Sequence, residues 1–267
     1  MSPAKVATIE ADGVKVFYRY AGAEDAPTLL LLHGQHLPTC FGFTTVPPSR
    51  DYQYTFASLT KTLTAFVDAL KLKRFAIYIF DYGAPTGLRL ALDRPDAVAA
   101  IITQNGNAYV DGFGADFWAP IKKAWESGSP EDIEALRGAT KFEITKWQYT
   151  NGSPHPEAIQ PEAYYLDQAL MEREGNADIQ LKLFYDYRTN VPLYPKFQEY
   201  FRTSGVPVLA IWGNRDDIFV APGAEAFRRD VKRLELHWLD AGHFAIETNE
   251  KEAAKHIEDF LANQKVF

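Results

Sequence analysis

The sequence predicts an α/β fold with a mostly parallel sheet, and two observations support this prediction. Short, continuous apolar runs, which are typical of strands buried on both faces, recur along the chain. These runs are Thr28–Leu32, Arg74–Phe80, Val98–Thr103, Val206–Trp212 and Leu234–Leu239. Helical patterns alternate with them, and that alternation favours a parallel sheet covered by helices on both faces.

The composition excludes several classes of protein. Hydrophobic residues make up 46% of the 267 and charged residues 24%, a balance typical of a globular domain. A net charge of −7 offers no basic surface for nucleic acid or anionic lipid. No apolar run is long enough to span a bilayer, and the first residues lack a secretory signal, so we expect a cytoplasmic protein. The single cysteine, Cys40, excludes an internal disulfide and a multi-cysteine metal site.

The predicted elements follow in order along the chain. The first two strands, Val6–Ile9 and Val14–Tyr20, are joined by a turn that contains Asp12 and Gly13. Apolar residues recur at helical spacing from Thr55 to Leu72, and a second helix follows Gly87 and stops at Pro95.

The sequence pattern changes between residues 109 and 203. Helical patterns there are broken by Gly and Pro, and tryptophans and tyrosines are frequent. We interpret residues 109–203 as a helical lid inserted into an α/β core made of residues 1–108 and 204–267. Two more helices, Glu225–Asp230 and Lys251–Ala262, are predicted in the second part of the core.

Polar groups follow four of the apolar strands. They are His33-Gly34, Asp81, Asp216 and His243. Because chemistry in parallel sheets collects at the carboxyl ends of the strands, we expect these groups to meet at one edge.

Asp81 stands at a sharp corner between a strand and a helix. Gly83, two residues later, allows the strand and helix backbones to approach closely. This is the pattern of a nucleophile elbow, with aspartate in place of the more frequent serine. Aspartate is also a favoured N-cap, so Asp81 could instead serve only to begin its helix.

With these residues in place, nearly the whole chain resembles an α/β-hydrolase of the branch that contains epoxide hydrolases and haloalkane dehalogenases. The order of nucleophile, lid, acid and base in that family matches Asp81, residues 109–203, Asp216 and His243. No Gly-x-Ser-x-Gly motif follows a strand, which argues against a serine esterase.

Two features depart from the family pattern. Only 47 residues separate Gly34 from Asp81, so the chain lacks one helix and one strand after residue 35, on the order of 20–25 residues. Either the neighbouring strands close up, or the shortened fold is compromised. The second departure is Tyr82, which stands where the dehalogenases of this branch usually carry tryptophan.

The resemblance implies a mechanism through an ester. The Asp81 carboxylate would attack a saturated carbon, and water deprotonated by His243 would then hydrolyse the ester. Asp216 would orient His243, with Asp217 as the competing acid. The resemblance also implies that the backbone N–H groups of Gln35 and Tyr82 form the oxyanion hole.

Other polar residues have simpler explanations. His33 is expected to be structural, His243 could be a core histidine, and Cys40 is expected to be a small buried residue. No metal site is expected, because no thiolate or acidic cluster accompanies His33 and His36.

Substrate class depends on the lid. Epoxide hydrolases place two lid tyrosines at the epoxide oxygen, and the best matches here are Tyr187 and, less closely, Tyr149, although either could only pack in the core. Dehalogenation needs N–H donors for halide, which Trp118, Trp125 or Trp147 could supply.

We therefore expect a hydrolase of small, apolar epoxides that uses no cofactor, with haloalkane hydrolysis as the alternative. The expected partner is a small-molecule substrate, with no nucleic acid or membrane, and a homodimer is left open. A different class is a catalytically impaired, ligand-binding member of the same fold.

Overall fold

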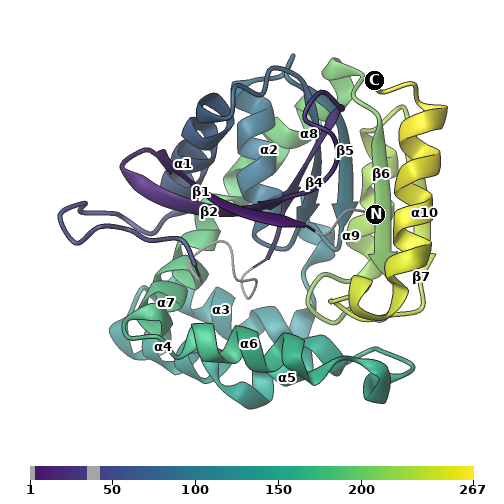
Figure 1. Cartoon of the computed structure of the whole chain (residues 1–267). Helices are drawn as coiled ribbons and strands as arrows, with labels where there is room; N and C mark the ends of the chain where they lie inside the picture. The colour runs from purple at the N-terminus through teal and green to yellow at the C-terminus, as the bar shows by residue number, and fades with distance from the viewer. Residues whose placement is uncertain (1–3, 35–42) are drawn as a thin grey trace.

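The computed structural model describes residues 4–34 and 43–267 (Figure 1). Five strands form a sheet in the order β3-β4-β5-β6-β7, and every neighbouring pair in it is parallel. Their bounds are β3 Thr28–Leu32, β4 Phe75–Phe80, β5 Val98–Gln104, β6 Val208–Gly213 and β7 Leu234–Leu239. The predicted α/β fold with a mostly parallel sheet is therefore confirmed.

Helices cover both faces of this sheet. Alternate residues of β4 point to opposite faces, so Ile77 and Ile79 belong to one hydrophobic core and Ala76 and Phe80 to the other. The first core packs under α1 (Phe56–Ala69), α2 (Gly83–Asp93) and α8 (Tyr194–Ser204), and the second packs under α10 (Ile246–Asn263). Figure 1 shows α1 and α2 on one side of the strands and α10 on the other.

The shortened segment after residue 35 changes the edge of the sheet. Residues 33–34 and 43–55, the described part of the connection between β3 and α1, contain neither a helix nor a strand. The hairpin of β1 (Lys5–Ala11) and β2 (Val14–Tyr20) forms its own antiparallel sheet and contacts α1. Among residues 4–34 and 43–267, β3 pairs with β4 alone and not with the hairpin, so the strands have not closed up there, and Leu31 of β3 is 63% exposed.

The segment between β5 and β6 is helical, as the sequence predicts. Helices α3–α7 gather below the sheet in Figure 1, whereas α8 packs against α2 of the core. The elements of this segment are η1 Val110–Gly112, α3 Ala115–Ser127, α4 Pro130–Ala135, η2 Leu136–Thr140, α5 Phe142–Thr150, η3 Pro156–Ala158, α6 Pro161–Met171, α7 Asn176–Asp186, η4 Tyr187–Thr189 and η5 Val191–Leu193.

Two predicted helices begin earlier than expected. Helix α9 spans Ala221–Ala226, followed by the 3₁₀ helix η6 (Phe227–Arg229), because Pro222 suits the first turn of a helix. Helix α10 begins at Ile246 and continues through a kink at Asn249. None of the helices in the described ranges is both long and apolar enough to cross a membrane.

Candidate active site

Asp81 lies at the corner between β4 and α2 in a conformation that few non-glycine residues adopt. Its φ is +47°, and the residue is only 7% exposed. A Cβ atom added to Gly83 would lie 2.2 Å from the carbonyl oxygen of Leu32, so the backbones of α2 and β3 are in direct contact there. The corner therefore has the strained, crowded geometry of a nucleophile elbow.

The N-cap position of α2 is occupied by Tyr82 and not by Asp81. The Tyr82 side chain forms no capping hydrogen bond. The Asp81 carboxyl group instead lies beside Gly34, where an added Cβ atom would be 2.6 Å from Asp81 Oδ2. The end of β3 and the corner after β4 thus meet as the sequence predicts.

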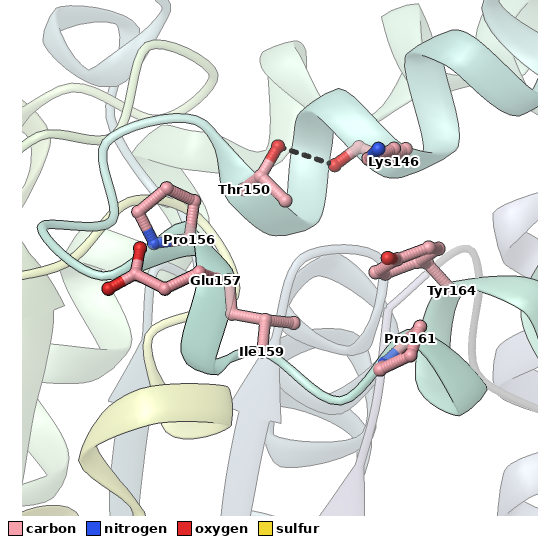
Figure 2. Close-up of a pocket in the computed structure, with 7 residues that line it drawn as sticks. All are labelled: Lys146, Thr150, Pro156, Glu157, Ile159, Pro161 and Tyr164. Carbon is pink, nitrogen blue, oxygen red and sulfur yellow. Dashed lines mark hydrogen bonds between the residues drawn. The ribbon is translucent and has the colours of Figure 1, made fainter.

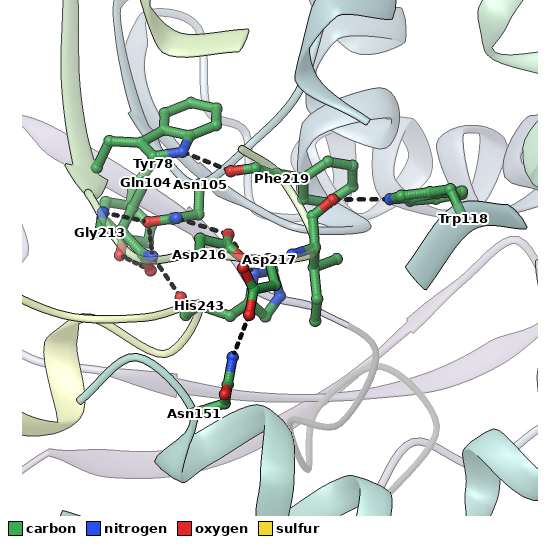
Figure 3. Close-up of polar contacts among 12 residues, drawn as sticks. Tyr78, Gln104, Asn105, Trp118, Asn151, Gly213, Asp216, Asp217, Phe219 and His243 are labelled. Atoms are coloured by element: carbon green, nitrogen blue, oxygen red, sulfur yellow. Dashed lines mark hydrogen bonds and ion pairs between the residues drawn. The ribbon is translucent and has the colours of Figure 1, made fainter. Parts of the chain in front are cut away.

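The imidazole of His243 pairs with Asp216 (Figure 3). Its Nδ1 atom is 2.8 Å from Asp216 Oδ2, and both side chains are buried. The backbone N–H of Ile218 donates to Asp216 Oδ1 at 2.7 Å. The competing acid, Asp217, is exposed and accepts a hydrogen bond from Asn151 of the insertion. The structure thus joins Asp216, not Asp217, to the histidine.

The charge balance around His243 favours its protonated form. Burial alone would lower the pKa of the imidazole, but the charge and hydrogen bond of Asp216, together with the charge of Asp81, raise it above 6.5. The negative charge of Asp81 thus acts on His243 across the site. Residues 81, 216 and 243 come together at the carboxyl ends of three strands.

The negative charge of Asp81 also contributes to the raised pKa values of two buried tyrosines. Burial and the Asp81 carboxylate raise the pKa of Tyr82 well above 10. Burial raises the pKa of Tyr187 in the same way, with contributions from Tyr194 and Asp81. The rings of Tyr82 and Tyr187 lie 6.0 Å apart. Both phenols therefore stay neutral beside the carboxylate.

The two hydroxyl groups differ in their partners. Tyr187 forms a 3.3 Å hydrogen bond with the hydroxyl of Tyr194. The hydroxyl of Tyr82 is buried and has no hydrogen-bond partner among the described residues. An unpaired buried hydroxyl carries a free-energy penalty that a bound ligand can remove.

Tyr149 lies at a different contact from Tyr187. Its hydroxyl donates to Asp167 of α6, and its ring stacks on Phe244 with the centroids 3.9 Å apart. Tyr149 is therefore separated from His243 by one residue, Phe244, and its hydroxyl proton points to the carboxyl group of Asp167.

Two of the three tryptophans considered as halide donors are engaged elsewhere. The indole N–H of Trp118 donates to the carbonyl of Ile218 at 2.8 Å, and that of Trp125 to the carbonyl of Phe184 at 2.8 Å. Their rings pack around Tyr187, with that of Trp118 4.9 Å from it. They shape the surroundings of the phenol and do not offer N–H groups.

Of the two predicted oxyanion donors, one can be placed. Tyr82 stands at the N-terminus of α2, where backbone N–H groups lack helical acceptors. Gln35, like His36 and Cys40, lies outside the described residues. His33 Nδ1 lies 2.9 Å from the carbonyl oxygen of Gly34, and burial lowers the pKa of His33 to about 4, so this ring is neutral.

Sequence reasoning missed two residues that touch the acid and the base. Asn105 donates to Asp216 Oδ2 at 2.7 Å, and Gln104 donates to the carbonyl oxygen of His243 at 2.9 Å (Figure 3). The available signal was the polar sequence Gln104-Asn105 at the end of the buried strand β5.

Two pockets of the described structure lie elsewhere. One, of about 410 Å³, sits between α5 and α6 of the insertion, and Figure 2 shows its lining residues. The other, of about 590 Å³, lies along α1 and α2. Neither is lined by Asp81, Asp216 or His243. Within the described ranges, no cluster of three His, Cys, Asp or Glu side chains is placed to hold a metal ion.

Comparisons with known proteins agree with this geometry at the level of the fold. The epoxide hydrolase VrEH1 of Vigna radiata aligns with a TM-score of 0.72 at 20% identity, covering 97% of this chain and 98% of the other. The haloalkane dehalogenase DatA of Agrobacterium tumefaciens C58 aligns with a TM-score of 0.75 at 17% identity, covering 98% of this chain and 97% of the other.

A relative and a family profile extend the likeness to the sequence. The uncharacterized hydrolase YNR064C of Saccharomyces cerevisiae is 42% identical over an alignment that is 278 positions long and covers 94% of each chain. Because this alignment is longer than the 267 residues of the present chain, the yeast protein carries residues that this chain lacks. The profile of the alpha/beta hydrolase fold matches residues 40–250. The chain therefore belongs to the α/β-hydrolase fold family.

Proposed function

We propose that this protein is a hydrolase that opens small, apolar epoxides through an ester on Asp81. The observation that carries this proposal is the position of Tyr187, a buried phenol whose ring lies 6.0 Å from that of Tyr82, the residue next to Asp81. A carboxylate nucleophile with a neutral phenol beside it supplies both groups that ring opening needs.

In the first step, an Asp81 oxygen attacks a ring carbon and the carbon–oxygen bond of the epoxide breaks. Tyr187 gives its proton to the departing oxygen, so the product of this step is a hydroxyalkyl ester and a phenolate. The hydroxyl of Tyr82, which lacks a partner among the described residues, is a second donor to the same oxygen. We assign no proton donation to Tyr149, because its hydroxyl already donates a hydrogen bond to Asp167.

The charge change on Asp81 helps both steps. When the carboxylate becomes an ester, it loses the negative charge that contributes to the raised pKa values of Tyr187 and His243. The phenol becomes a stronger acid as the ring oxygen departs, and the imidazole releases its proton more readily. The neutral base is therefore favoured when it is needed.

In the second step, His243 takes a proton from water, and the resulting hydroxide attacks the ester carbonyl. The tetrahedral oxyanion is stabilised by backbone N–H groups at the start of α2, with Tyr82 the first of them. Collapse of this intermediate releases the diol and restores the Asp81 carboxylate. The proton held by His243 then returns to the Tyr187 phenolate, so the balance is epoxide plus water to diol.

Haloalkane hydrolysis is the second candidate, since the same ester forms when Asp81 displaces halide. The engaged indoles of Trp118 and Trp125 favour epoxides, because both N–H groups already donate to backbone carbonyls. Trp147 and the Tyr82 hydroxyl remain as donors for halide.

Parallel assays with styrene oxide and 1-bromobutane separate the two reactions. We expect diol from styrene oxide and little bromide from 1-bromobutane. Release of bromide without diol would reverse the order of the two candidates. A stable, monodisperse protein that turns over neither probe would instead favour a ligand-binding role. A Tyr187→Phe variant should lose most diol formation, on the order of 10²-fold or more, because it removes the acid.

A further inference from the structure

Two amide side chains at the end of β5 contact both members of the acid–base pair. Gln104 is the last residue of β5, and Asn105 follows it with a φ of +45°. Both are fully buried. A left-handed backbone is tolerated by asparagine, and here it lies at the carboxyl edge of the sheet, next to the loops that follow β6 and β7.

The Asn105 amide makes three hydrogen bonds, and these partners fix its orientation. Its nitrogen donates to Asp216 Oδ2 at 2.7 Å, and its oxygen accepts from the backbone N–H of Gly213 at 3.0 Å and from Gln104 Nε2 at 2.7 Å. Only the amide nitrogen can donate to a carboxylate, and only the amide oxygen can accept from N–H groups.

Asp216 in turn receives three donors. Oδ2 is shared by His243 and Asn105, while Oδ1 is held by the backbone N–H of Ile218. With a donor on each side, the carboxylate plane cannot rotate without breaking at least one charge-assisted hydrogen bond. Ile218 belongs to the same loop as Asp216, whereas His243 follows β7 and Asn105 follows β5, so donors from two other strand ends hold the carboxylate.

Gln104 extends the same network to the base. Its Nε2 atom also donates to the carbonyl oxygen of His243 at 2.9 Å, and its Oε1 atom accepts from the hydroxyl of Tyr78 at 3.0 Å. Neighbouring residues of one strand end thus hold the side chain of the acid and the backbone of the base.

We propose that Asn105 is a positioning residue, whose amide orients Asp216 so that His243 keeps its proton on Nδ1 and presents Nε2 to water. This role rests on the proposed function. It predicts that a change at Asn105 slows hydrolysis of the ester and leaves its formation by Asp81 nearly intact. A purely structural role would lower stability and slow both steps together.

The sharpest variant is Asn105→Asp, which keeps the shape and the acceptor but loses the donor. The titratable groups around this position are Asp216 and His243, with Tyr78 behind Gln104 and Asp81 beyond the imidazole. The introduced carboxyl group can donate to Asp216 only when it is protonated. The variant-to-parent ratio of ester hydrolysis rates should therefore be low at high pH and should recover as the pH falls.

Rapid-quench mass spectrometry with styrene oxide measures the two steps separately. We expect hydrolysis to fall on the order of 10- to 100-fold in Asn105→Asp at high pH, the loss typical when a hydrogen bond that orients a functional side chain is removed, with ester formation within about threefold of the parent. Asn105→Ala has no donor, so its ratio should stay low at every pH. A pH-independent ratio in Asn105→Asp, or equal losses in both steps, would overturn the proposal.

A matched control and a measurement without substrate complete the test. Asn176→Asp places the same change at a buried asparagine of α7, whose amide donates to the carbonyl of Leu170, and it should leave the ratio at one. At a pH above the pKa of His243, nitrogen-15 NMR of the neutral ring should show the Nδ1–H tautomer in the parent and a mixture in Asn105→Ala. If the parent forms no ester the proposed function fails, but an unchanged tautomer in Asn105→Ala is what would refute the role of Asn105.

Discussion

The carboxylate of Asp186 accepts a hydrogen bond, 2.8 Å long, from the backbone N–H of Phe56. Asp186 ends α7 of the insertion, whereas Phe56 begins α1 of the core. A few residues later, Asn190 accepts hydrogen bonds of 2.8 and 3.1 Å from Arg89 of α2. These contacts tie the chain to the core on both sides of Tyr187 and hold its phenol near Asp81.

Asp186→Ala should therefore act on both stability and activity. Loss of a carboxylate at a helix N-terminus costs about 0.5–2 kcal/mol, which urea unfolding can measure. Epoxide opening should fall as well, because Tyr187 loses one anchor. Glu126→Ala, an exposed acid of α3, is the control and should change neither quantity. If the variant loses stability but opens epoxides at the parent rate, the hydrogen bond of Asp186 does not position Tyr187 for catalysis.

Gly83→Ala should destabilise the protein by about 1–3 kcal/mol or more, because the new methyl group would lie 2.2 Å from a backbone oxygen of β3. Gly138→Ala meets nothing within 4 Å and serves as the control. Thermal unfolding of both variants gives the comparison. Equal midpoints would contradict the close contact of strand and helix at the elbow.

The pair of Asp167 and Tyr149 makes stability depend on pH. Burial raises the pKa of Asp167 from 3.8 to about 7, against the hydrogen bond from Tyr149 and with a contribution from Glu247. Between about pH 4 and 7 the folded chain holds a proton that the unfolded chain has released. The free energy of unfolding should thus decrease as the pH rises, by at most about 1.4 kcal/mol per pH unit from this group.

Asp167→Asn keeps the acceptor for Tyr149 and removes the titration. Urea unfolding at several pH values should show a flatter profile in this variant than in the parent. Glu162→Gln, an exposed acid of the same helix, should leave the profile as it is. An identical slope for Asp167→Asn and the parent would show that Asp167 is not protonated in the folded chain.

Asp81→Asn should lower the pKa of His243, because it removes one of the negative charges that raise it. The folded parent holds this proton more tightly than the unfolded chain, so the stabilisation from His243 is complete at low pH and is lost as the pH rises through its pKa. Proton NMR titration of the His243 ring measures the shift directly. Asp217→Asn, which alters an exposed carboxylate bonded to Asn151, is the control.

The sequence predicted the elements of the core well, because apolar runs and helical spacing are local signals. Strands β3 and β7 have the predicted bounds, and the groups after β6 and β7, Asp216 and His243, form a hydrogen bond. The missing helix and strand were also apparent from the small number of residues between Gly34 and Asp81 in the sequence. The separate sheet formed by the hairpin of β1 and β2 could not be predicted from the sequence, because it depends on the surface against which the hairpin packs.

The remaining features depend on contacts between distant segments, which no local pattern encodes. Asn105 and Asp216 are 111 residues apart, and Asp186 and Phe56 are 130 apart. The partner of Tyr149 is likewise set by the packing of α5 on α6, so its spacing in the sequence could not show that its hydroxyl would meet Asp167.

If Asp81 forms a covalent ester that His243 hydrolyses, removal of the base should trap that ester. In a His243→Gln variant incubated with styrene oxide, the peptide carrying Asp81 should gain the mass of one substrate molecule, and the adduct should persist. The same variant with Asp81→Ala added should gain no mass. If the parent turns over styrene oxide but the His243→Gln variant never acquires mass on that peptide, Asp81 does not form the ester.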